Sequence, residues 1–225
     1  MKKVTKNIYS KRFGYFNIYI MKGIGGDILI DTGFIGIRRR LKRLLDSFNI
    51  KYIILTHAHI DHIWNANYIK KLYNCKIIMG IEDIVNIDNS NIKSKPVNKY
   101  YKYRTKLMNY FMRKINPEIF NVDIAIKTDK CLKLCGIELN IITLKGHTNG
   151  SIGVLYNDYL FAGDALVNRK WYIETAYQNQ SNEYAVKSAL KIIKLKPKLI
   201  LIGHELPIKY NKLLKSRNKI INKIK

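Results

Sequence analysis

Cysteine is scarce in this chain of 225 residues, and the three that occur, Cys75, Cys131 and Cys135, lack the paired spacing of a zinc ribbon. An odd number without such pairing predicts free thiols in a reducing compartment. No apolar run is long enough to span a bilayer. Polar and charged residues follow the basic start, where an export signal would need an apolar stretch. These absences predict a soluble cytoplasmic protein with no membrane partner.

Acidic residues are also few. The chain has 16 Asp and Glu against 41 Lys and Arg, which gives a formal net charge of +25. A surface of this kind attracts polyanions, so nucleic acid is a candidate partner. We do not favour it on charge alone, because Lys, Asn and Ile are used heavily even where nothing functional is apparent. A small-molecule substrate is the preferred expectation, and the oligomeric state is left open.

The length and the hydrophobic content of 47% fit a single domain over residues 1–225. Helical spacing predicts a helix with Ile37 and Phe48 on its apolar face, others over 67–73 and 182–195, and a C-terminal one from about 207. Residues from about 86 to 120 are expected to form an inserted helical segment that could cap a site. The expected strands cover residues 15–21, 27–31, 52–55, 76–79, 137–143, 151–156, 159–162 and 199–202.

Histidine is rare as well, and its placement is the most informative feature of the sequence. Three of the five histidines lie in Thr56-His57-Ala58-His59-Ile60-Asp61-His62, directly after the apolar run 52–55. The other two, His147 and His204, each follow a glycine after another strand-like run, as does Asp164. Imidazoles and carboxylates gathered at strand ends predict a metal site.

Four candidate ligands in one tight turn point in different directions, which predicts two metal ions. We expect one ion to be held by three imidazoles and the other by a carboxylate and two imidazoles, with Asp164 bridging both. The first set is His57, His59 and His147, and the second is Asp61, His62 and His204. Mixed nitrogen and oxygen donors suit Zn²⁺, so two zinc ions per chain are expected, although Fe and Mn also accept such ligands. A hydroxide held between the ions is the expected nucleophile.

Other side chains are expected to assist. Asp61 is the candidate catalytic residue, because a carboxylate beside the nucleophile can orient it and carry a proton to the leaving group. Asp31, at the end of the expected strand 27–31, is the candidate outer acceptor that fixes a ligand imidazole, with turn capping as the alternative role. Trp64 and Tyr172 are candidates for lining the pocket or for ordinary packing.

Taken together, these motifs resemble those of the metallo-β-lactamase fold superfamily. The match rests on the signature loop 56–62 and, in the family's order, on residues 146–151, 161–164 and 203–204, with 28–33 as the early strand and turn. The resemblance implies an α/β fold, the αββα sandwich of two mixed β-sheets flanked by helices, with a dimetal site at one edge between the sheets. Ile63-Trp64-Asn65 replaces the glycines usual after the signature loop, so the mouth of the site is expected to differ.

Several branches of this superfamily fit the seven ligands, among them glyoxalase II-like thioesterases, N-acyl-homoserine lactonases and general hydrolases. The resemblance therefore implies a metal-dependent hydrolase that cleaves a carboxylic ester, thioester or lactone. A metal-dependent nuclease or nucleic-acid-binding protein is one alternative, although tRNA-processing nucleases use an additional histidine that this chain lacks. A mononuclear-iron persulfide dioxygenase is the other, since these enzymes share much of the motif.

Overall fold

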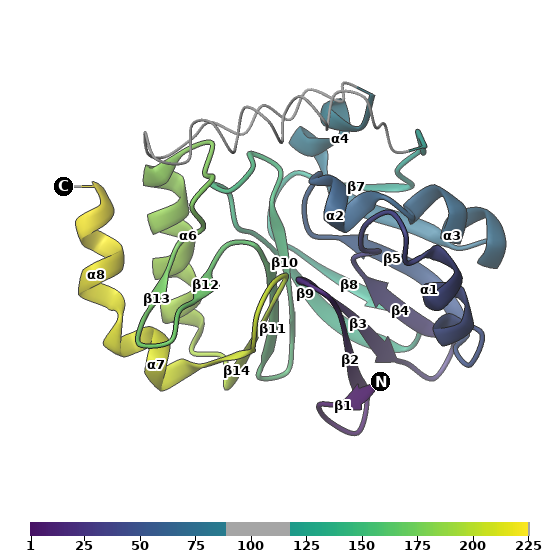
Figure 1. Cartoon of the computed structure of the whole chain (residues 1–225), viewed down its shortest axis with the longest axis horizontal. Coiled ribbons are helices and arrows are strands. Elements are labelled where there is room, and N and C mark those ends of the chain that lie inside the picture. Colours follow the sequence, from purple (N-terminus) through teal and green to yellow (C-terminus); the bar gives the residue numbers. More distant parts are fainter. Residues whose placement is uncertain (89–117, 225) are drawn as a thin grey trace.

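A computed structural model describes residues 1–88 and 118–224 of the chain. Two β-sheets pack face to face between two outer layers of helices (Figure 1). This arrangement is the αββα sandwich expected from the sequence. Most of the expected insertion at about 86–120, including its proposed helices, lies outside the described residues.

The first sheet is formed by the N-terminal part of the chain, and its strands lie side by side in sequence order. The first four pair antiparallel and the last four run parallel. Parallel strands place their carboxyl ends at one edge, where ligands bind in α/β folds. The strands are β1 (Lys2–Lys3), β2 (Ile8–Phe13), β3 (Phe16–Lys22), β4 (Asp27–Ile30), β5 (Ile50–Leu55), β6 (Lys76–Gly80) and β7 (Ile124–Ile126).

The second sheet has the order β15-β14-β11-β10-β9-β8. Its one parallel pair joins β11 to β14, and its other neighbours run antiparallel. A separate hairpin joins β12 (Val167–Asn168) to β13 (Ile173–Glu174). The sheet contains β8 (Lys130–Leu134), β9 (Ile137–Thr143), β10 (Ile152–Tyr156), β11 (Tyr159–Gly163), β14 (Leu199–Ile202) and β15 (Ile208–Lys209).

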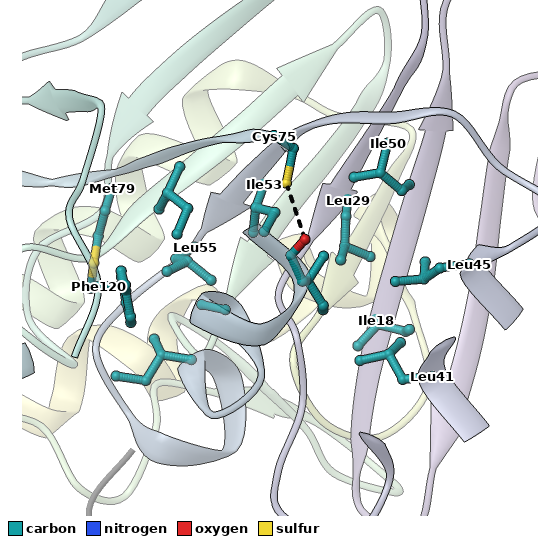
Figure 2. Packing of buried hydrophobic residues seen from close by; sticks show 14 of the residues in the cluster. Ile18, Leu29, Leu41, Leu45, Ile50, Ile53, Leu55, Cys75, Met79 and Phe120 are labelled. Carbon is teal, nitrogen blue, oxygen red and sulfur yellow. Dashed lines mark hydrogen bonds between the residues drawn. The ribbon is translucent and has the colours of Figure 1, made fainter. Parts of the chain in front are cut away.

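Helices cover the outer face of each sheet (Figure 1). On the first sheet, Leu41 and Leu45 pack against Ile18 and Leu29, in the cluster of buried side chains that Figure 2 shows. Successive side chains of β4 point to opposite faces of the sheet, and both faces are buried. Leu29 joins this outer cluster, while Ile28 and Ile30 face the second sheet. The helices of this side are α1 (Arg38–Leu45), α2 (Ile60–Ile63), α3 (Ala66–Tyr73) and α4 (Ile81–Asp88).

The helix that covers the second sheet is α6 (Asn182–Leu195), which packs Val186, Ala189 and Ile192 against it. Its N-cap is Ser181, whose side chain accepts a hydrogen bond from the Tyr184 N–H. Among the described residues, no helix is both long and apolar enough to cross a membrane. The three cysteines form no disulfide with one another, which confirms the prediction of free thiols.

The expectation of one C-terminal helix from about residue 207 is wrong. The segment begins as the short strand β15 and continues as α7 (Tyr210–Lys215), α8 (Arg217–Ile221) and the 3₁₀ helix η2 (Asn222–Ile224). The break falls at Ser216, whose hydroxyl accepts from the Ile173 N–H at 2.8 Å and donates to the Lys212 carbonyl at 2.9 Å. A contact with a distant strand therefore divides an otherwise helical pattern.

Candidate metal centre

The predicted ligands follow the ends of strands in both sheets, and the structure brings all of them together. The signature segment spans the loop after β5 and the helix α2, which holds Asp61 and His62, while the loops after β9, β11 and β14 carry the remaining ligands. Two groups result, and within each group the ligand atoms lie within 4.8 Å of one another. One consists of His57, His59, His147 and Asp164, and the other of Asp61, His62 and His204.

Three imidazole nitrogens converge in the first group. His59 Nδ1 lies 3.0 Å from His57 Nε2 and 2.8 Å from His147 Nε2. Asp164 Oδ2 lies 3.9 Å from His57 Nε2 and 3.7 Å from His147 Nε2. His57 and His147 are buried. Three nitrogens and a carboxylate oxygen around one point are a donor set that Zn²⁺ accepts.

The second group shares Asp164 with the first. His204 Nε2 lies 3.1 Å from Asp164 Oδ2 and 3.2 Å from Asp61 Oδ2. His62 Nε2 lies 3.5 Å from Asp164 Oδ1 and 3.8 Å from Asp61 Oδ2. Because both oxygens of Asp164 face imidazoles, and these belong to different groups, this carboxylate has the position expected of a bridging ligand.

Unsatisfied atoms in the second group fit a cation. His62 Nε2 and Asp164 Oδ1 are buried and have no hydrogen-bond partner among the described residues. Leaving such groups unpaired costs about 1–3 kcal/mol each, and more for a charged group. A metal ion coordinated by both would remove that cost. The donor types and these unpaired atoms therefore fit a metal.

Outer hydrogen bonds orient the rings of the signature loop. Asp31 Oδ2 accepts from the Thr56 hydroxyl at 2.9 Å and lies 2.8 Å from His62 Nδ1. Since the Thr56 hydroxyl donates to Asp31, it accepts from His57 Nδ1, 3.0 Å away. Both rings then carry their proton on Nδ1, which leaves the Nε2 lone pair for a metal. Asp31 has the outer-acceptor position that the sequence analysis suggested.

His204 is fixed by a backbone group that the sequence analysis missed. Its Nδ1 donates to the Tyr15 carbonyl at 2.7 Å, in the turn between β2 and β3. The neighbouring Asn17 N–H donates to the Gly203 carbonyl at 2.7 Å. A Cβ at position 203 would overlap Asp164 Oδ1 and lie 2.6 Å from His62 Cε1, so this position requires glycine.

Asp83 is a second feature that the sequence analysis missed. This fully buried carboxylate accepts from the Ala58 N–H at 2.9 Å, the Thr148 hydroxyl at 2.7 Å and the Gly150 N–H at 2.8 Å. It thereby joins the signature loop to the loop of His147. Its position in the first turn of α4, directly after the buried strand β6, was the available signal.

Burial and charge divide the imidazoles into two kinds. Burial lowers the pKa of His57 well below its ordinary value and that of His147 to about 3, and neighbouring imidazoles add to the effect. Burial is the largest influence on His62 and His204 and opposes their charge, but the neighbouring carboxylates, Asp164 foremost and Asp61 with it, together outweigh burial. They raise the pKa of His204 to about 10 and that of His62 well above its ordinary value. A metal in the first group meets neutral imidazoles, whereas one in the second must displace protons from its imidazoles.

The two aromatic candidates have different surroundings. Trp64 packs edge-on against Phe34, with ring centroids 5.6 Å apart, and lines a cavity of about 400 Å³ together with Asn65 and Arg38. Tyr172 instead lies beneath the Lys219 ammonium group of α8, 3.0 Å from its ring centroid. Trp64, which follows the signature loop, stays a candidate for shaping the site, and the contact shown for Tyr172 is with α8.

A family model described as the metallo-beta-lactamase superfamily matches residues 12–204, a span that includes every candidate ligand. The chain belongs to the metallo-beta-lactamase superfamily. A probable metallo-hydrolase of Methanocaldococcus jannaschii is 30% identical over 158 residues, which cover 68% of this chain and 69% of that protein. Superfamily membership and the His/Asp cluster together support a metal-dependent hydrolase in general.

Solved structures share the superfamily fold. A metallo-beta-lactamase family protein from Thermus thermophilus gives a TM-score of 0.73 at 18% identity, with 96% of this chain and 80% of that chain covered. BJP-1, a subclass B3 metallo-beta-lactamase of Bradyrhizobium japonicum, also gives 0.73 at 18% identity, with 99% and 91% covered. At such low identity the likeness shows the αββα fold and leaves the substrate open.

Proposed function

We propose that this protein is a dimetal hydrolase that binds two zinc ions and cleaves a carboxylic ester, thioester or lactone. The observation that supports this most strongly is the position of Asp164 between two donor groups. Counting Asp164 in both, each group offers four ligands, the number that Zn²⁺ prefers. When bound, the two ions would supply an activated water and an electrophile for the substrate carbonyl.

Asp61 is the residue we propose for proton transfer. Its side chain is 31% exposed and that of His204 is 34% exposed, whereas His62 is buried, so substrate approaches from the Asp61 and His204 side. Burial would raise the pKa of Asp61, but the charge of His62 and the hydrogen bond from His204 lower it to about 2. At neutral pH this carboxylate accepts a hydrogen bond from the attacking water and moves the proton towards the leaving group.

Metal analysis tests the composition of the centre. Protein purified without added metal should contain close to two zinc ions per chain, and Asp164→Asn should hold fewer. Asp158→Asn is a matched control, because Asp158 and Asp164 flank opposite ends of β11. One iron per chain with oxygen consumption would replace the proposal with the mononuclear-iron alternative.

A substrate panel tests the reaction. Esters, thioesters, lactones and phosphodiesters are compared with the zinc-loaded protein, Asp61→Asn and Asp158→Asn. We expect turnover of at least one carboxylic substrate, reduced on the order of 10²–10⁴-fold in Asp61→Asn and unchanged in Asp158→Asn. Turnover of phosphodiesters alone would favour the nuclease alternative and contradict the proposal.

A further inference from the structure

A hollow of about 470 Å³ lies at the end of the second sheet opposite the metal centre. Tyr159 and Leu199, which line it, are the first residues of β11 and β14. The same two parallel strands lead at their other ends to Asp164 and His204. With a rise of about 3.3 Å per residue, the hollow lies roughly 13–16 Å from the centre along the strands. It is therefore a separate place on the molecule.

The floor of the hollow is apolar. Leu199 is in register with Tyr159 on one side and with Lys209 of β15 on the other, so these three side chains form a row across the sheet. Tyr159, Leu199 and Val4 are half-buried and pack at the margin of the core between the sheets. The floor thus offers a tyrosine ring and aliphatic surface to a flat apolar group.

The rim is positive. Lys196, Lys198 and Lys209 line the hollow and are exposed, and no carboxylate lines it among the described residues. None of these lysines forms an ion pair within the described part of the chain, where six other lysines do. Lys196 caps the C-terminus of α6, where a cation is favourable on its own account. Lys198 and Lys209 have no such role, and an anion would relieve the repulsion among the three.

We propose that this hollow binds a nucleotide, with the base against the Tyr159 and Leu199 floor and the phosphates at the lysine rim. An aromatic floor beside cationic groups is how proteins hold unpaired nucleotides. More than one phosphate charge is needed to match three ammonium groups. The nucleotide can be free or part of a single strand, since both present the same chemistry. Lys2 and Lys3, which precede Val4 and are exposed, extend the positive surface beyond the rim and suit a strand.

Fluorescence anisotropy with a labelled ten-nucleotide poly-dT strand tests the site. The variant Lys196→Gln/Lys198→Gln/Lys209→Gln should bind at least tenfold more weakly than the wild type. The slope of log Kd against log salt concentration should also be smaller by about 2 in the variant. Each phosphate that is no longer neutralised contributes about 0.7 to this slope, and three are lost. The matched control changes three exposed lysines that lie outside the hollow, Lys71, Lys130 and Lys133, to Gln. Equal losses in the two variants would overturn the proposal, because net charge alone would then explain binding.

Two further measurements define the ligand. Tyr159→Leu keeps the floor apolar but removes the ring, and should weaken binding roughly fivefold or more. Competition for the labelled strand by unlabelled strand and by thymidine triphosphate distinguishes a free nucleotide from nucleic acid as the ligand. Displacement of the labelled strand by the triphosphate at matched phosphate concentration indicates a free nucleotide. Displacement by the unlabelled strand alone indicates nucleic acid. If inorganic pyrophosphate competes as well as both, the base is not recognised and the proposal is wrong. Unchanged metal content and melting temperature show that the variants are folded.

Discussion

At the scale of single residues, Asp31 shows how the centre is positioned. Its backbone lies in the left-handed region, with φ of 58°, which Asp adopts at less cost than most residues other than glycine. In this conformation Oδ1 accepts from the Thr56 N–H at 2.8 Å, while Oδ2 reaches the Thr56 hydroxyl and His62. The strained backbone therefore aims the carboxylate at one candidate ligand, His62, and at Thr56, which holds the ring of another, His57, and this role goes beyond turn capping.

Replacing Asp31 by Asn tests this role. The amide fits the same backbone conformation but removes the charge and one acceptor oxygen that hold Thr56 and His62. We expect zinc affinity to fall about 10- to 100-fold, as for other outer partners of metal-bound histidine, measured by competition with a chelator. Asp27→Asn is the control: Asp27 lies at the other end of β4 and accepts from the Asn49 N–H. Equal loss of affinity in both variants would show a general effect of destabilisation.

His147 predicts how the stability of the metal-free protein changes with pH. Its pKa is about 3 when folded, against an ordinary value of 6.5, because burial disfavours the charge. Between these two values the unfolded chain binds more protons at His147 than the folded protein does. The contribution of His147 to the stability of the fold is therefore present above pH 6.5 and is lost as the pH falls towards 3. The free energy of unfolding should therefore decrease by up to about 1.4 kcal/mol per pH unit from this group.

Urea unfolding of metal-free wild type and His147→Asn at several values between pH 4.5 and 7 measures this contribution. The variant lacks the imidazole, so its stability should fall less steeply as the pH is lowered. Parallel pH profiles for the two proteins would contradict the neutral, buried state of His147.

At the scale of elements, the start of α6 supports the His147 loop. The Ser181 N–H donates to the Gly146 carbonyl at 3.0 Å, and the Gln180 N–H donates to the His147 carbonyl at 3.2 Å. A Cβ on Gly146 would overlap the backbone of Ala185, so the loop and the helix lie in close contact. The helix thus contributes to the centre through backbone groups, independently of its side-chain cap.

Ser181→Ala separates the two contributions. Loss of the N-cap hydroxyl should lower the free energy of unfolding by about 1 kcal/mol, while Ser181→Asp should retain most of it. Zinc affinity should stay unchanged in both, because the backbone donors at 180 and 181 remain. Denaturant unfolding and chelator competition on the same samples check the pair. A loss of affinity with Ser181→Ala would mean that the side chain itself holds the loop.

Helices and strands whose apolar residues follow a clear pattern could be predicted from the sequence. The helix expected over 182–195 has those bounds, and the buried run 199–202 is β14. The strand β2 could not be predicted, because Ser10, Lys11 and Arg12 interrupt its alternation and its identity depends on pairing with β3. The break at Ser216 was missed for a similar reason, since it depends on a hydrogen bond to β13.

The candidate ligands could be predicted because coordination chemistry requires particular residue types at strand ends. Their surroundings could be predicted only in part. Asp31 was accessible to sequence reasoning as a carboxylate on a neighbouring strand. The Tyr15 carbonyl is a backbone group that any residue could supply. Asp83 acts through contacts with Thr148 and Gly150, more than 60 positions away, which no local pattern records.

At the scale of the whole molecule, the centre joins two layers that are already attached. The signature loop belongs to the first sheet, and His147, Asp164 and His204 belong to the second. Near the centre, the Tyr19 hydroxyl donates to the Ile202 carbonyl at 2.6 Å, and the Ile152 N–H donates to the Thr56 carbonyl at 2.8 Å. A continuous apolar core between the sheets adds to these bonds. The fold should therefore persist without metal.

Metal removal tests that conclusion. The chelated protein should keep its circular dichroism spectrum and unfold cooperatively at a lower temperature. Zinc at 100 times its Kd should restore about 2.7 kcal/mol, because a ligand that binds only the folded state stabilises it by mass action. Hydrogen exchange should locate the loosening at residues 57–62 and 203–205, while Ile54 and Leu201 in the core between the sheets keep their protection. Loss of protection at these two core residues would mean that the metal, and not the apolar interface, holds the sheets together.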